Sequence, residues 1–138
     1  MEMIDKILLP TDGSAYSLKA AEYAAKLAIE LGSKVSILHV SEYHPHVRAR
    51  ELVHEEEKAA EVILSETNKV LEKAGVSAEL MKLQFGHPAD IICTVAERER
   101  FDIVVMGEKG AHEIGRFMLG SVADRVAHHA PCPVLIVR

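Results

Sequence analysis

Residues 101–110 read Phe-Asp-Ile-Val-Val-Met-Gly-Glu-Lys-Gly, an apolar run that ends in two glycines separated by two residues. An apolar run of this kind is typical of a parallel strand that is covered on both faces. Gly107 and Gly110 follow at its carboxyl end, where glycine lets backbone N–H groups turn towards a ligand without obstruction by a Cβ atom. This stretch therefore indicates an α/β fold with a candidate anion-binding loop.

A second anion-binding element is predicted nine residues further on. Gly120 and Ser121 begin a helical segment that extends to about Ala130, and the unpaired N–H groups at a helix N-terminus attract negative charge. Taken alone, Gly107 and Gly110 would be ordinary turn glycines and Ser121 an ordinary helix cap. The complete spacing, Gly-x2-Gly-x9-Gly-Ser, favours phosphate binding, but it is not a Walker A loop because the Gly-Lys-Ser/Thr ending is missing.

Strand and helix patterns alternate along the whole chain. Strands are expected at residues 6–10, 35–40, 78–85, 101–106 and 133–137. Helices are expected from a Ser14 cap to Gly32, over residues 48–74 with Gly75 as the stop, from Pro88 onward, and from Ser121 to about Ala130. This βαβαβαβαβ order predicts an α/β fold: a single domain over residues 1–138 with a doubly wound, five-stranded parallel sheet of the Rossmann-like type.

Three of the expected helices show an apolar stripe. In the helix capped by Ser14 it is expected to consist of Leu18, Ala21, Ala25 and Ala28. In the helix over residues 48–74 the stripe is expected to consist of Val62, Ile63, Val70 and Leu71. In the helix that begins at Pro88 it is expected to consist of Ile91, Ile92, Val95 and Ala96.

Composition excludes several classes of function. The formal net charge of the 138 residues is −5, which disfavours non-specific nucleic-acid binding. No apolar run approaches the ~20 residues that a membrane span needs, and no signal-peptide pattern follows Met1. Cys93 and Cys132 do not suggest a disulfide framework. The chain is therefore expected to be cytoplasmic and to bind neither nucleic acid nor membrane.

The loop after the first strand is a second candidate for ligand contact. It reads Pro10-Thr-Asp-Gly-Ser14, and the Asp12 carboxylate would accept hydrogen bonds from a ribose hydroxyl or an adenine amino group. The alternative is an ordinary turn aspartate that binds its own backbone. Ligands of doubly wound sheets bind beyond the carboxyl ends of neighbouring strands whose connections leave to opposite faces. If the first and fourth strands are neighbours, this loop and the loop that begins with Gly107 and Gly110 (the glycine loop) line one crevice.

Charged and nucleophilic residues do not form a catalytic pattern. Lys109, His112 and Arg116 would neutralise phosphate charge or remain solvated. Glu108 would repel a phosphate unless its carboxylate points to solvent or binds a cation that bridges to the phosphate. The eight histidines lack the i, i+4 spacing of a helical zinc pair. No spacing favours a nucleophile with a neighbouring general base. No catalytic residue and no metal ligand is therefore predicted.

Several segments together resemble the universal stress protein family, and the spacing of the glycine loop is similar to that of its nucleotide-binding branch. The resemblance covers essentially the whole chain. The segments that carry it are Lys6-Ile-Leu-Leu-Pro-Thr-Asp-Gly-Ser14, Gly86-His-Pro-Ala89, Asp102-Ile-Val-Val-Met-Gly107, Gly120-Ser-Val-Ala-Asp-Arg-Val126 and Ala130-Pro-Cys-Pro-Val-Leu-Ile-Val137.

The resemblance implies a strand order of 3-2-1-4-5 and an adenine nucleotide, ATP or AMP, in the crevice. Asp12 and the backbone of Val40 would hold the adenosine, with Pro10 and Thr11 packed beside it. The residues implied around the ribose and phosphates are Met106, Gly107, Gly110, Gly120, Ser121 and Val122. The resemblance also implies a homodimer through the last strand, residues 133–137, whose edge would otherwise be exposed.

Glu108 departs from the small, polar or basic residue that family members often carry there. This departure favours AMP, ADP or ATP bridged by a metal ion such as Mg²⁺ over free ATP. The leading hypothesis is an adenine-nucleotide-binding stress-response switch or adaptor. The alternatives are slow ATP hydrolysis with Lys109, Ser121 and a metal ion at the same site, and a dimeric interaction module without nucleotide.

Overall fold

The main sheet has five parallel strands in the order β4-β2-β1-β6-β7. The computed structural model describes residues 4–42, 50–111, 113, 115 and 117–138. The strands of the sheet are β1 (Lys6–Pro10), β2 (Lys34–Leu38), β4 (Ala78–Leu80), β6 (Ile103–Gly107) and β7 (Val134–Val137). Counted along the chain, this order is the predicted 3-2-1-4-5, and the α/β fold class is confirmed.

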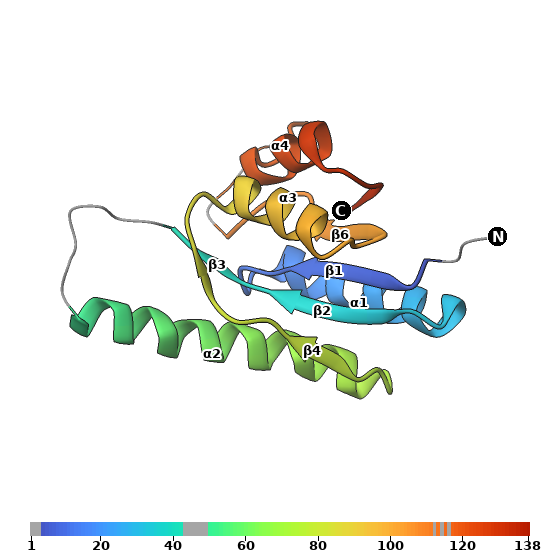
Figure 1. The fold of residues 1–138 in the computed structure, drawn as a ribbon, viewed down its shortest axis with the longest axis horizontal. Coiled ribbons are helices and arrows are strands. Elements are labelled where there is room, and N and C mark those ends of the chain that lie inside the picture. The colour runs from blue at the N-terminus through green and yellow to red at the C-terminus, as the bar shows by residue number, and fades with distance from the viewer. Residues whose placement is uncertain (1–3, 43–49, 112, 114, 116) are drawn as a thin grey trace.

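Helices cover both faces of the sheet. They are α1 (Ala15–Leu31), α2 (Arg50–Lys73), α3 (Pro88–Arg98) and α4 (Ser121–His129). α1 and α2 pack against one buried apolar cluster, and α3 and α4 pack against a second. Strand β1 contributes to both, because Ile7 and Leu9 face the first cluster and Leu8 faces the second. Figure 1 shows α3 and α4 together on one side of the sheet and α2 on the other.

Local sequence signals account for the helix ends. The Ser14 hydroxyl accepts a hydrogen bond of 3.2 Å from the Ser17 amide, which caps the N-terminus of α1. Gly32 ends this helix in the left-handed conformation at φ 68°. Pro88 occupies the first turn of α3, where a missing N–H costs nothing. The predicted start and stop of α1 and the predicted start of α3 are therefore confirmed.

Two expected strands are each divided in two. The run over residues 35–40 forms β2 and then β3 (Val40–Ser41), and the run over residues 78–85 forms β4 and then β5 (Gln84–Phe85). β3 and β5 pair in parallel as a separate small sheet. The reason is that β1 ends at Pro10, opposite Leu38 in β2, so the chain beyond Leu38 has lost that neighbour and pairs elsewhere.

The predicted stripe of α2 was wrong at Val62. Its side chain is 56% exposed, while the buried line of the helix runs through Ala60, Leu64, Thr67 and Leu71. These positions follow one another at intervals of three or four residues, and Val62 lies on the opposite side of the helix. A polar residue, Thr67, belongs to the buried line, which a search for apolar residues alone overlooks. Residues 48 and 49 of the expected helix lie outside the described residues.

β1 and β6 form the switch point of the sheet. They are parallel neighbours, with Ile7 opposite Ile103 and Leu8 opposite Val104. β1 leads into α1 on one face, whereas β6 leads through the glycine loop into α4 on the other face. The two loops therefore leave the same edge in opposite directions, and a crevice between them is expected. Within the described part of the chain, no helix has the length and apolar character needed to cross a membrane.

Candidate functional site

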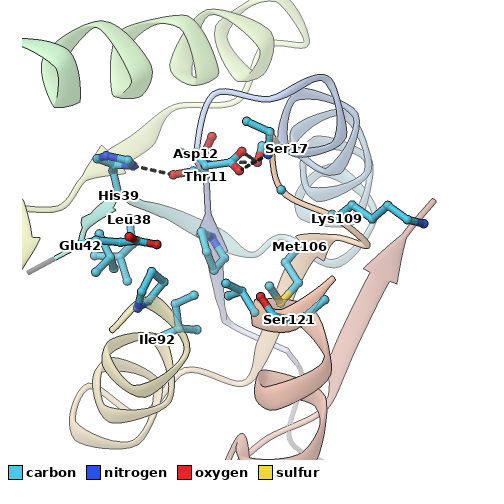
Figure 2. A pocket seen from close by; sticks show the side chains of 18 of the residues that line it. Thr11, Asp12, Ser17, Leu38, His39, Glu42, Ile92, Met106, Lys109 and Ser121 are labelled. Atoms are coloured by element: carbon cyan, nitrogen blue, oxygen red, sulfur yellow. Dashed lines mark hydrogen bonds between the residues drawn. The ribbon is translucent and has the colours of Figure 1, made fainter. Parts of the chain in front are cut away.

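A cavity of about 660 Å³ lies beyond the carboxyl ends of β1 and β6. Nine of the ten binding residues predicted from the sequence line it, as Figure 2 shows for several of them. These nine are Pro10, Thr11, Asp12, Val40, Met106, Gly107, Gly110, Ser121 and Val122. Gly120, the tenth, is buried beside the cavity as the N-cap of α4. The fold therefore brings the two predicted loops to one crevice.

Asp12 connects the two loops. Its Oδ1 atom accepts hydrogen bonds from the Ser14 amide at 2.9 Å and from the Ser17 hydroxyl at 2.7 Å. Its Oδ2 atom accepts a hydrogen bond of 3.0 Å from the Ala111 amide in the glycine loop. The bond to Ser14 is the ordinary turn contact of an aspartate, but the bond to Ala111 crosses the crevice. Asp12 thus has a fixed orientation against the cavity.

The hydrogen bonds of Asp12 outweigh its burial. Burial raises the pKa of this carboxyl, but the hydrogen bonds from Ser14, Ser17 and Ala111 favour the ionised form, and the net effect is a lowered pKa. Asp12 is therefore a carboxylate at neutral pH. A carboxylate only accepts hydrogen bonds, so its ligand partners must be donors such as sugar hydroxyls or amino groups.

A chain of hydrogen bonds fixes the position of Thr11. The Thr67 hydroxyl donates to the Ile63 carbonyl at 2.9 Å, so the Thr11 hydroxyl is the donor in the 2.8 Å bond between the two threonine oxygens. The Thr11 oxygen in turn accepts from the Gly13 amide at 3.2 Å. The Thr11 hydroxyl therefore donates its hydrogen bond to Thr67 of α2. Thr11 also lines the cavity, next to Asp12.

His39 contributes a polar ring to the wall opposite the glycine loop. Its Nδ1 atom lies 2.8 Å from the Thr11 carbonyl oxygen, as the dashed line in Figure 2 shows. A carbonyl oxygen only accepts, so Nδ1 carries the proton and Nε2 of the neutral ring is left as an acceptor. Sequence reasoning missed His39, because a single histidine next to a strand end carries no recognisable spacing.

The wall formed by β3 and α2 carries two acidic residues, Glu42 and Glu56. Glu56 Oε2 accepts a hydrogen bond of 3.1 Å from the Ser41 hydroxyl, which ties α2 to β3. Both carboxylates were also missed, since Glu56 belongs to the acidic start of α2, which reads as a solvated helix face, and Glu42 follows β3 without a recognisable spacing. The floor is apolar, with Ile92, Met106 and Ala123 among the lining side chains. A flat apolar group with hydrogen-bonding edges fits such a mixture of surfaces.

The amides that open α4 are already engaged by the protein. The Gly120 amide donates to the Glu108 carbonyl oxygen at 2.7 Å. The Ser121 amide donates to Glu113 Oε2 at 2.8 Å. Val122 and Ala123, the next two residues of the first turn, also line the cavity. The first turn of α4 therefore faces the cavity, and the Glu113 carboxylate accepts the hydrogen bond of its first amide, that of Ser121.

The two glycines of the glycine loop are needed for different reasons. A Cβ atom on Gly107 would lie 2.8 Å from Tyr16 Cβ and 2.9 Å from the Tyr16 backbone carbon, so Gly107 allows β6 to approach α1. A Cβ atom on Gly110 would lie 3.0 Å from Asp12 Oδ2. Gly110 thus allows the glycine loop to approach the Asp12 carboxylate.

The charged residues of the loop differ in where they point. Lys109 is buried, its side chain extends away from Asp12 in Figure 2, and its Nζ atom lies 3.4 Å from Glu108 Oε1. The Lys109 ammonium is therefore paired with Glu108. His112 and Arg116, the other two basic candidates, lie outside the described residues.

Comparison with known proteins gives one consistent result. The chain matches the Universal stress protein family over residues 3–138. The universal stress protein MJ0531 of Methanocaldococcus jannaschii is 38% identical over 142 residues, which cover 96% of this chain and 81% of that protein.

Solved structures agree with this result. The universal stress protein UspA from Lactobacillus plantarum shares the fold with a TM-score of 0.85, at 22% identity and with 100% of both chains covered. A universal stress protein crystallised in complex with cAMP has a TM-score of 0.81, at 28% identity and with 99% of both chains covered. Because the family match extends over nearly every residue and the close relative covers almost the whole chain, this chain belongs to the universal stress protein family.

Proposed function

We propose that this protein binds an adenine nucleotide in the cavity between β1 and β6 and acts as a switch or adaptor in the stress response. The observation that carries the proposal is that one cavity joins an oriented carboxylate, Asp12, to the first turn of α4. The carboxylate suits the hydroxyl or amino donors of a nucleoside, and the helix N-terminus suits a phosphate. The similar protein that was crystallised with cAMP supports a ligand of this class.

The proposed roles are those that the family resemblance implies, and the position of these residues at or beside the cavity supports them. Asp12 and the backbone of Val40 hold the adenosine, with Pro10 and Thr11 beside it. Met106 supplies apolar contact. Gly107 and Gly110 allow the loop to reach its position, and Gly120, Ser121 and Val122 form the turn that faces the phosphates.

Binding is proposed in preference to turnover. Slow ATP hydrolysis would need a cation next to the phosphates, and the Lys109 ammonium is paired with Glu108 instead. A Mg²⁺ ion that arrives with ATP would supply such a cation. For this reason the binding experiment includes ATP with and without Mg²⁺.

A cytoplasmic homodimer completes the proposal. β7 lies at the edge of the sheet, and its residues Val134, Leu135 and Ile136 are each half-buried. An apolar edge strand is a liability unless another chain covers it. Antiparallel pairing of β7 with its copy would cover this edge.

Isothermal titration calorimetry with adenosine, AMP, GTP, and ATP in the presence and absence of Mg²⁺ tests the binding. We expect saturable binding of the adenine compounds and weaker binding of GTP. The variant Asp90→Asn is a control, because Asp90 is an exposed acid that pairs with Arg125 and is not among the cavity residues. The proposal fails if none of the adenine compounds binds at millimolar concentration.

A further inference from the structure

The carboxylate of Glu113 occupies the N-terminus of α4. Its Oε2 atom accepts the hydrogen bond of 2.8 Å from the Ser121 amide. A Cβ atom on Gly120 would lie 2.8 Å from both carboxylate oxygens, and one on Gly110 would lie 3.4 Å from Oε1. The carboxylate thus sits against the bare backbone of both glycines, in the space that small residues leave open.

The Glu113 carboxylate occupies the position at the helix N-terminus that a bound anion would take. The N-cap residue of α4 is Gly120, which has no side chain to cap the helix. The amides of a first helical turn lack partners within the helix, and its dipole favours negative charge. Glu113 supplies both an acceptor and a negative charge from eight residues upstream. Glu113 is itself among the residues that line the cavity.

A phosphate and the Glu113 carboxylate cannot share this position. Both are anions, both need the Ser121 amide, and like charges in contact repel. A ligand that places a phosphate at α4 must therefore displace Glu113 from the amide. A nucleoside without a phosphate, held by Asp12 at the other loop, binds without displacing Glu113 from the Ser121 amide.

We propose that Glu113 is an internal competitor for the phosphate position and sets how strongly the cavity discriminates between ligands of different phosphate content. This inference rests on the proposed nucleotide binding. Its consequence is that phosphates add less affinity in this protein than the glycine loop alone would provide. Adenosine and AMP are thereby favoured relative to ATP.

Glu108 is the neighbouring acid that provides a matched control. It stands five residues earlier in the same loop, but its carboxylate pairs with Lys109 at 3.4 Å and it is not among the cavity residues. The variants Glu113→Gln and Glu108→Gln each remove one negative charge from the loop. Glutamine also keeps the length of the side chain and an oxygen acceptor, so the two variants differ chiefly in where the charge was.

Calorimetric titration of wild type, Glu113→Gln and Glu108→Gln with adenosine and ATP tests the proposal. We expect Glu113→Gln to lower the Kd for ATP about tenfold, because the repulsion between the Glu113 carboxylate and a phosphate next to it is removed. Its Kd for adenosine should change by less than about twofold, because that ligand carries no charge. Glu108→Gln also releases Lys109, but the Glu108 charge lies off the Ser121 amide and the Lys109 side chain extends away from Asp12 (Figure 2), so the Kd for ATP should change by less than about threefold.

A second measurement does not depend on adenosine. Sodium tripolyphosphate is titrated into each ¹⁵N-labelled protein, and the amide resonances of Ser121 and Val122 are followed. In Glu113→Gln we expect half-saturation at about one tenth of the concentration that wild type requires.

The outcomes separate the two proposals. If wild type binds adenosine but Glu113→Gln gains no more affinity for ATP than Glu108→Gln, the role of Glu113 is overturned and the nucleotide site stands. If no adenine compound binds any of the three proteins, the proposed function fails. In that case the tripolyphosphate titration still decides whether Glu113 excludes phosphate from α4.

Discussion

The Asp12 carboxylate and the Ala111 amide are joined by a hydrogen bond of 3.0 Å, although 99 positions separate them in the sequence. Asp12 follows β1 and Ala111 lies in the glycine loop after β6, so this bond ties together the two loops that leave the switch point in opposite directions. The shape of the cavity therefore depends on Asp12 even before a ligand is bound.

Asp12→Ala is expected to weaken adenosine and AMP binding about 10- to 100-fold. The substitution removes an ionised acceptor, whose hydrogen bonds are stronger than those of neutral groups, and releases the glycine loop. Calorimetric titration of the variant measures the loss, with Asp90→Asn as the control for loss of an acid outside the cavity. Affinity within about twofold of wild type would show that Asp12 only stabilises the turn.

The lowered pKa of Asp12 predicts a pH-dependent contribution to stability. The folded protein holds the pKa below the ordinary value of 3.8, so the contribution is complete above about pH 4 and is lost as the pH falls through the folded pKa. Wild type should exceed Asp12→Asn in free energy of unfolding by about 1 kcal/mol at neutral pH. Urea denaturation of both proteins between neutral pH and pH 3 should show this difference shrink towards the acid end. A difference that stays constant over this range would contradict the assignment.

Much of the fold could be predicted because its signals are local. Ser14, Gly32 and Pro88 mark helix ends through the conformations that these residue types prefer. The order of the strands needed the family resemblance in addition, since local patterns do not show which strands are neighbours. The error at Val62 arose because the buried line of α2 includes Thr67, whose hydroxyl is satisfied by Thr11 in a distant loop.

Gly107→Ala is expected to destabilise the protein by about 2–3 kcal/mol, because the added Cβ would overlap Tyr16 at the start of α1. Thermal and urea unfolding measure the loss. Gly32→Ala is the matched control: a Cβ there meets no atom within 4 Å, and only the left-handed backbone at φ 68° opposes it. The control should cost about 1 kcal/mol. Equal losses for the two variants would argue against a close contact at Tyr16.

Ile136→Lys is expected to convert the proposed dimer into a monomer. Each copy would bring a lysine to the paired β7 edge, where its charge would have to be buried without a partner. Sedimentation velocity measures the change. Val62→Lys is the control, because Val62 is also apolar but lies on the outer side of α2. A wild-type protein that sediments as a monomer, or a dimer that survives Ile136→Lys, would contradict pairing through β7.

The site could be predicted less completely than the fold. The glycines and Asp12 belong to continuous motifs, and nine of the ten predicted residues line the cavity. Glu56 comes from the middle of the sequence on α2, and no short-range pattern connects it with the loops. The sequence indicates Glu108 as the acid that opposes a phosphate, because Glu108 stands between Gly107 and Gly110. Only the folded loop shows that Glu113 is the acid that reaches the Ser121 amide.

Ser17 has two roles, one through its backbone amide and one through its side-chain hydroxyl. Its amide donates to the hydroxyl of Ser14 at the start of α1, and its own hydroxyl donates to the Asp12 carboxylate. A change of side chain at Ser17 would leave the helix intact but would release the carboxylate from its orientation. Natural variation at positions 12 and 17 should therefore be correlated, so that chains without an acid at the first position also lose the hydroxyl at the second.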